Sequence, residues 1–424
     1  MRNSGLLTVL LVLALMLPAG CVRQRHSRPA PAPGQAGTTT PAGPPVQEAT
    51  RLLAARGAAL VRKDRAAFLA VVDSGRGTYR QQQERMFASL QEVPLGSFEH
   101  RITAWDPQLD ELRRRYQPDP VFVANLEIRY RLRGEALPTV GTSAFTFVRT
   151  ASGWRIGGEN EAPFADRPSY QLWDGGKLRS LASGRTLVVF RPGAETLATR
   201  VLRSADKAYS RVDRVWGPTW DHRVVLVIPS GPKEAARLLD GWDMKGIPLA
   251  IPYPPDAKTP QDNVIYLNAQ VLKPYDEFNL DYGFAHEMTH IATRTVRKVP
   301  FMVREGFAEY VAAHDLGFSF RKQYAALAGK GRSFDGKLVT RDVFVADNDL
   351  SLSYDRASSF CSWVARTFGE ARLVALYHSF AGADWPSEDS KVEQEVLDQR
   401  FRKVLGASFT TVEQRWAGYV RAHL

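Results

Sequence analysis

The chain has 424 residues, of which 24% are charged, and its formal net charge is +11. A chain of this length suggests two or three domains and can bury a substantial core. The basic residues are dispersed rather than clustered, so the charge does not predict nucleic-acid binding. The only long apolar run, Leu6 to Leu17, is too short to span a bilayer, which excludes a membrane channel.

Residues 1–21 have the pattern of an export signal. The apolar run fits the h-region of a secretory signal peptide. The segment Leu17–Cys21 reads Leu-Pro-Ala-Gly-Cys and resembles a bacterial lipoprotein box, although Pro18 stands where an aliphatic residue is usual. Ordinary signal cleavage therefore stays open. The resemblance implies an exported protein that is lipid-anchored at Cys21 to the extracytoplasmic face of the cell membrane, where its positive charge suits an anionic envelope.

Residues 22–47 are rich in Pro, Ala, Gly and Thr and show no apolar period. We therefore expect a disordered tether between the anchor and the folded part. In an extended state of about 3.1 Å per residue it would span several tens of ångströms, enough to cross part of a cell wall.

A different composition, at residues 48–165, predicts helices followed by antiparallel strands. Apolar spacing indicates helices through Ala49–Val61 and Tyr79–Leu90. Alternation predicts strands at Phe98–Trp105, Val121–Leu132, Ser143–Thr150 and Gly153–Gly158. This order resembles the cone-shaped fold of the ketosteroid isomerase and nuclear transport factor superfamily. No convergent acid and tyrosine pair is evident, so we expect a structural or docking role for this domain.

Residues 180–424 predict a small mixed sheet with helices, then a mostly helical end. The expected elements are strands at Thr186–Phe190, Val224–Pro229 and Val264–Asn268, and helices at Ala194–Val212, Pro232–Leu239 and Phe301–Ala312. The segments Tyr354–Phe368, Glu370–Phe380 and Val392–Leu424 are expected to be mostly helical. A further helix is expected from about Asp281 to Val296, directly after the third strand. The whole chain is therefore predicted to be α+β.

That further helix contains the sequence His-Glu-Met-Thr-His at His286–His290. At 3.6 residues per turn, His286 and His290 lie on one helix face, so both imidazoles can reach one ion. Glu287 lies between them, in position to take a proton from a metal-bound water. A catalytic Zn²⁺ usually has three protein ligands and one open position, so a third ligand is needed.

Glu305 and Glu309 are the candidates for that ligand. They lie one turn apart on the same face of an otherwise apolar helix. Burying two acids there is costly unless a positive charge compensates them, and a divalent metal ion would do so.

The two motifs together resemble those of gluzincin metallopeptidases of the MA clan, the thermolysin and aminopeptidase type. In that group the HExxH helix is followed by a Glu-Gly-x-Ala segment whose glutamate is the third zinc ligand, which here is Glu305. Glu309 would then accept the N–H of the first zinc histidine. Fourteen residues separate His290 from Glu305, whereas the eighteen of the large aminopeptidases would select Glu309, so the choice between the two stays open.

The same resemblance assigns two further features. Tyr354 begins a helix similar to one whose tyrosine stabilises the oxyanion, although Ala357 stands where glycine is usual and Tyr354 could equally be a core aromatic. The strand Val264–Asn268 corresponds to one that pairs with an extended peptide substrate, or it is an ordinary interior strand.

These residues predict an exported zinc metallopeptidase that cleaves peptide bonds of an envelope peptide or protein, with Glu287 as the general base. Two alternatives stay open: a catalytically inactive envelope scaffold or binding lipoprotein, and a zinc hydrolase acting on cell-wall amide bonds. The natural substrate and the mode of cleavage are not encoded in any motif.

Overall fold

The computed structural model describes residues 44–106, 110–161, 168–239, 241, 244, 249–250, 263–296, 298–340, 343, 349–382 and 390–424. The predicted signal segment with Cys21 and residues 22–43 of the predicted tether lie outside these ranges. The first helix, α1, begins at Pro44, inside the range predicted as tether. No helix within the described ranges combines the length and the apolar character that crossing a membrane requires.

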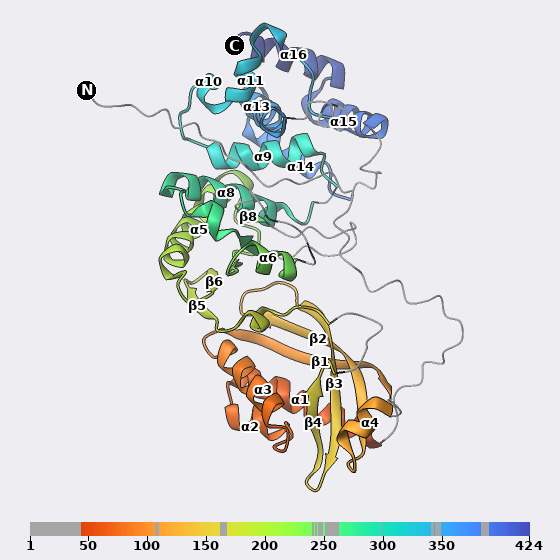
Figure 1. Cartoon of the computed structure of the whole chain (residues 1–424). Coiled ribbons are helices and arrows are strands. Elements are labelled where there is room, and N and C mark those ends of the chain that lie inside the picture. The colour runs from red at the N-terminus through yellow and green to blue at the C-terminus, as the bar shows by residue number, and fades with distance from the viewer. Residues whose placement is uncertain are drawn as a thin grey trace, which may run out of the picture.

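The N-terminal part packs helices on a four-stranded antiparallel sheet (Figure 1). The helices are α1 (Pro44–Arg62), α2 (Arg65–Ala70), α3 (Gly77–Leu90) and α4 (Asp110–Tyr116), and the strands are β1 (Leu95–Asp106), β2 (Val121–Leu132), β3 (Thr139–Thr150) and β4 (Gly153–Glu159), in the order β1-β2-β3-β4. The α+β class is confirmed, and all four predicted strands are present. Helices α2 and α4 were not predicted, because six or seven residues are too few to show an apolar period.

A second sheet follows the short helix η1 (Leu172–Gly175). Its strands are β5 (Arg179–Ala182), β6 (Thr186–Phe190), β7 (Val224–Ile228), β8 (Leu249–Ala250) and β9 (Val264–Leu267), in the order β5-β6-β7-β9-β8, with α5 (Glu195–Trp216) and α6 (Pro232–Leu238) as connections. Strands β6, β7 and β9 are parallel. Strand β9 therefore lies inside the sheet, and the hypothesis that this strand pairs with a substrate is wrong: β8 covers the edge that a substrate would need.

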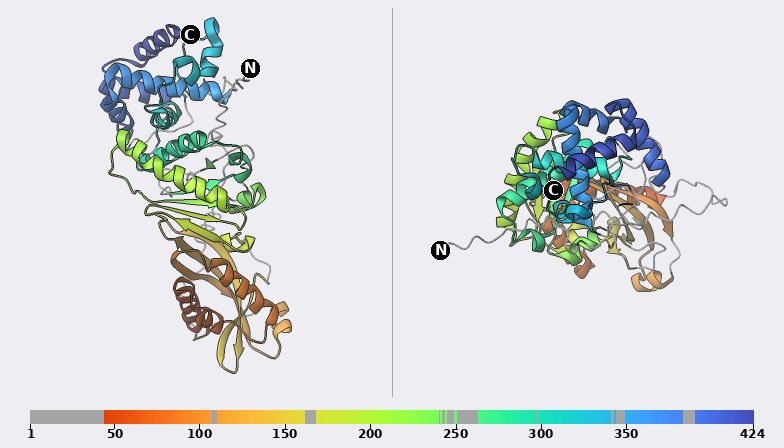
Figure 2. Two further views of the ribbon diagram at one scale, coloured as in Figure 1. Left: turned by 90° about the vertical axis from the view of Figure 1, so that its left-hand side faces the viewer. Right: turned by 90° about the horizontal axis from the view of Figure 1, so that it is seen from above.

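Both faces of this second sheet are buried. Alternate residues of β6 and β7 such as Val188 and Leu226 pack in the core with α5 and the helices that follow. The residues between them point the other way, into a core shared with the N-terminal part that includes Tyr130 and Trp173. Figures 1 and 2 show the second sheet between the N-terminal part and the helical C-terminal part. The N-terminal part thus supplies the second layer that a largely parallel sheet requires.

The C-terminal part is helical. It comprises α7 (Ala269–Leu272), α8 (Glu277–Thr293), α9 (Phe301–Ala313), α10 (Phe320–Gln323), α11 (Ala325–Lys330), η2 (Gly331–Ser333), α13 (Leu350–Phe368), α14 (Glu370–His378), α15 (Ser390–Leu405) and α16 (Phe409–Arg421). Helix α8 begins before the predicted Asp281 because the Asp276 side chain accepts from Asn279 N and caps it. Helix α9 begins after Pro300, as predicted.

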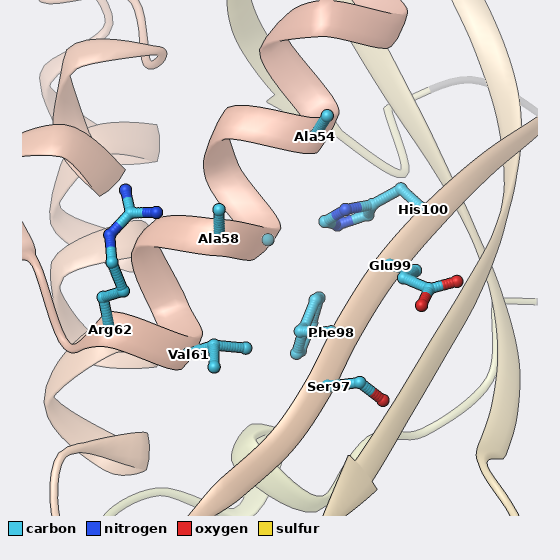
Figure 3. A pocket seen from close by; sticks show the side chains of 9 residues that line it. Ala54, Ala58, Val61, Arg62, Ser97, Phe98, Glu99 and His100 are labelled. Atoms are coloured by element: carbon cyan, nitrogen blue, oxygen red, sulfur yellow. The ribbon is translucent and has the colours of Figure 1, made fainter.

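A groove of about 480 Å³ lies between α1 and β1 of the N-terminal part. Figure 3 shows the imidazole of His100 and the ring of Phe98 extending from β1 toward α1, where Ala54 and Ala58 face them. Both ring nitrogens of His100 are buried. Burial, together with the nearby Arg56 guanidinium, lowers the pKa of His100 to about 3.

This imidazole should make stability depend on pH. An unfolded chain protonates His100 below about pH 6.5, whereas the folded chain does so only near pH 3, so the unfolded state binds the extra proton between these values. The free energy of unfolding should therefore fall by up to about 1.4 kcal/mol per pH unit from this residue as pH decreases from 6.5 toward 3. Urea denaturation of the parent and of His100→Phe at pH 7.5, 6.0 and 5.0 should show a shallower decline for the variant. Parallel declines would contradict the expectation.

Candidate metal centre

Helices α8 and α9 run antiparallel and bring two rows of polar side chains together. Tyr282, His286 and His290 follow one another at one-turn spacing on α8, and Glu305 and Glu309 do so on α9. Near the start of α8, the Tyr282 hydroxyl donates to Glu309, which lies late in α9. Later in α8, the His290 ring faces Glu305, which lies earlier in α9. All five side chains are buried. The two rows of side chains at one-turn spacing therefore face each other in a buried interface.

The predicted ligands His286, His290 and Glu305 converge at the centre of this interface. One donor atom from each lies within 4.8 Å of the other two. The two Nε2 atoms are 3.0 Å apart, and Glu305 Oε2 lies 3.4 Å from His286 Nε2 and 3.3 Å from His290 Nε2. Three lone-pair donors aimed at one point, two imidazole and one carboxylate, are the set that a catalytic zinc takes. The residues present fit such an ion.

The geometry separates the roles of the two glutamates. Glu305 approaches the Nε2 atoms of both histidines, whereas Glu309 Oε1 lies 3.0 Å from Nδ1, on the opposite side of the His286 ring. Glu305 is 1% exposed and Glu309 is 8% exposed, so neither is a solvated surface residue. The structure thus groups Glu305 with the two histidines and places Glu309 behind His286.

The charges within the cluster are strongly coupled. Although burial lowers it, the pKa of His286 is raised to about 10 by hydrogen bonds to the carboxylates of Glu305 and Glu309. Although burial raises it, the pKa of Glu305 lies well below its usual range because the His290 ring and the Arg304 guanidinium favour its charged form. A buried carboxylate needs such partners to stay ionised.

Glu287 lies beside the cluster and is 3% exposed. Its Oε2 has no hydrogen-bond partner among the described residues. Burial, opposed by His286 and assisted by Glu305 and Glu309, raises the pKa of Glu287 to about 7. A carboxylate with a free oxygen and a pKa near neutrality can both accept and return a proton.

Tyr354 also reaches the cluster. Its hydroxyl is 3.4 Å from Glu305 Oε2, and its ring centroid is 6.3 Å from that of His286. Helix α13 carries Tyr354 close to α9 because Gly306 leaves room: a Cβ there would lie 2.3 Å from the Ala357 carbonyl oxygen. The glycine of the Glu-Gly-Phe-Ala segment is thus required by helix packing.

Two residues of the site were not predicted from the sequence. Arg304 Nε donates to Glu305 Oε1 at 2.8 Å, which leaves Oε2 facing the two imidazoles. The Tyr282 hydroxyl donates to Glu309 Oε2 at 2.5 Å. The spacing of Tyr282, four residues before His286, could have indicated it, whereas no motif indicates Arg304.

No protein-family model matches the chain, and no curated protein matches it. Among solved structures, a mutant of a two-domain M1 zinc metallopeptidase bound to L-tryptophan is similar with 12% identity and a TM-score of 0.32, over 66% of this chain and 59% of that one. A mutant M1 zinc metallopeptidase from Deinococcus radiodurans is similar with 10% identity and a TM-score of 0.34, over 72% of this chain and 91% of that one. The chain thus spans less than two thirds of the length of the two-domain protein. TM-scores this low do not carry over an activity, which has to follow from the residues of the site.

Proposed function

We propose that the protein is a zinc-dependent hydrolase of peptide bonds, in which His286, His290 and Glu305 hold the ion. The observation that carries this proposal is the convergence of those three buried donors beside the unpartnered carboxylate oxygen of Glu287. A purely structural zinc site has four protein ligands and needs no general base. A three-donor set with an adjacent base supports catalysis instead.

A zinc ion bound there would supply Lewis acidity, which polarises a scissile carbonyl and makes a water molecule more acidic. Glu287 takes the proton of the attacking water on its free carboxylate oxygen and later delivers it to the leaving amine. The Tyr354 hydroxyl donates to the carbonyl oxygen as negative charge develops there, a contribution of roughly 3 kcal/mol for a single donor. Arg304 keeps Glu305 ionised and turned toward the histidines.

The proposal extends to the fold and the location. Residues 48–165 would be a cone-fold domain of the ketosteroid isomerase type, supported by helices α1 to α4 packed with a four-stranded meander. Residues 180–424 would be a gluzincin-like domain, supported by the order of mixed sheet, HExxH helix and helical end. Export and lipidation at Cys21 are supported by the sequence pattern of residues 1–21 alone, and mass spectrometry of the N-terminal peptide of the mature protein tests them.

The ligand set can be tested by zinc titration. The parent should bind about one zinc ion per chain, and Glu305→Ala should lose most of this affinity because a donor is removed. Glu309→Ala removes an equally buried acid one turn away and should weaken binding by about 10- to 100-fold while a site persists. Competition with a chromophoric chelator measures the zinc affinity of all three proteins.

Two results would contradict the proposal. A parent that binds no zinc would remove the metal centre altogether. A parent that binds zinc, but cleaves no member of a peptide library, would favour the scaffold alternative; cleavage of peptidoglycan fragments alone would favour the cell-wall hydrolase.

A further inference from the structure

Behind the metal centre, a third buried residue lies in line with His286 and Glu309. The Tyr282 hydroxyl donates to Glu309 Oε2 at 2.5 Å, and Glu309 Oε1 lies 3.0 Å from His286 Nδ1. Tyr282 is 9% exposed, and burial raises its pKa well above the usual range, so its hydroxyl keeps its proton and acts as a donor. The two oxygens of one carboxylate are thus divided between a tyrosine and an imidazole.

We propose that Tyr282 is a positioning residue of the metal centre, which fixes the Glu309 carboxylate and through it the ring of His286. The assignment rests on the proposed function, because it gives Tyr282 a role only if His286 is a metal ligand. It goes beyond that function by naming a residue that is neither one of the three donors nor the general base.

A buried carboxylate is costly unless hydrogen-bond donors satisfy it. Glu309 is 8% exposed and lies in an interface lined by apolar residues, so each of its oxygens needs a donor. Tyr282 satisfies Oε2, which leaves Oε1 for the N–H at Nδ1 of His286. A proton fixed at Nδ1 leaves the lone pair of Nε2 directed at the centre, the tautomer that a metal ligand must have.

The position of Tyr282 on its helix makes the arrangement rigid. It lies one turn before His286 on the same face of α8, so its hydroxyl and the imidazole reach Glu309 from one regular backbone. Both partners of the Glu309 carboxylate therefore come from a single helix. Removal of the hydroxyl would leave Oε2 unsatisfied and the carboxylate free to turn away from Nδ1.

The test is the zinc affinity of Tyr282→Phe, measured by chelator competition. The expected result is an affinity about 10-fold lower than that of the parent, with one zinc ion still bound at saturation. A double-mutant cycle gives the decisive measurement: in a Glu309→Ala background, Tyr282→Phe should change zinc affinity by less than about twofold, because the hydroxyl has lost the group through which it acts.

Tyr377→Phe is a matched control. Its hydroxyl is also buried and donates to a residue of α8, Thr293, at 2.9 Å, but it does not contact Glu309. It should lower stability without changing zinc affinity. If Tyr282→Phe behaved like Tyr377→Phe, or if its effect persisted in the Glu309→Ala background, the positioning role would be refuted while the metal centre stood. A parent without zinc would refute the proposed function and this assignment together.

Discussion

Glu287→Gln should reduce peptide hydrolysis by about 10²- to 10⁴-fold and leave the bound zinc unchanged. The amide has nearly the volume of the carboxylate and fits the same buried position, but it cannot take a proton from water. Since Glu287 approaches the cluster without being one of the three converging donors, the ion should stay in place. Single-turnover cleavage of a peptide and metal analysis of the same sample measure the two quantities together.

A matched control for this variant is available on the same helix. Glu277 lies in the first turn of α8, where it pairs with Arg200 and its side chain is 52% exposed. Glu277→Gln should retain both zinc and activity. If Glu287→Gln kept more than about a tenth of the parent's rate, another residue would have to be the base.

Val225→Asp should destabilise the whole protein by more than about 4 kcal/mol. Val225 is fully buried in β7 and points into the core that the second sheet shares with the N-terminal part. A carboxylate there would be buried in an apolar core and would disrupt the contact between the two layers, so the N-terminal part and the metal centre should be lost in one transition.

Chemical denaturation followed by far-UV circular dichroism measures this effect, and zinc release follows the metal centre. Val140→Asp is the control, because Val140 is a valine of β3 that is 51% exposed and should change stability by less than about 0.5 kcal/mol. Two separate transitions in the parent, with only one shifted in Val225→Asp, would show that the layers fold independently.

The sequence was sufficient to predict those features that depend on a single local repeat of residue types. The spacing of His286 and His290, the amphipathic helices and the four long strands of the N-terminal part all follow from periods of 3.6 or 2 residues. Helix α8 begins earlier than predicted because the Asp276 side chain caps its N-terminus, and the apolar period does not indicate this cap.

The remaining features depend on contacts between distant segments. The spacing in the sequence does not distinguish Glu305 from Glu309 as a ligand. Only the direction in which α9 packs on α8 places Glu305 near the Nε2 atoms and Glu309 near Nδ1 of His286. Whether β9 is an edge or an interior strand stayed open in the sequence, because the two residues of β8 are too few to show an alternation. The partnership of Tyr282 with Glu309 likewise requires knowing that the two helices are antiparallel.

The second sheet has a consequence for how this protein could be divided. The face of this sheet that packs on the N-terminal part includes Leu187, Val189, Val225, Val227 and Val264, which belong to strands β6, β7 and β9. The boundary between the two parts therefore runs through a hydrophobic core rather than along a linker. A minimal fragment that keeps the three converging donors could not be obtained by trimming the chain alone: a designer would first have to replace these five residues by polar ones, or provide a substitute layer to cover them.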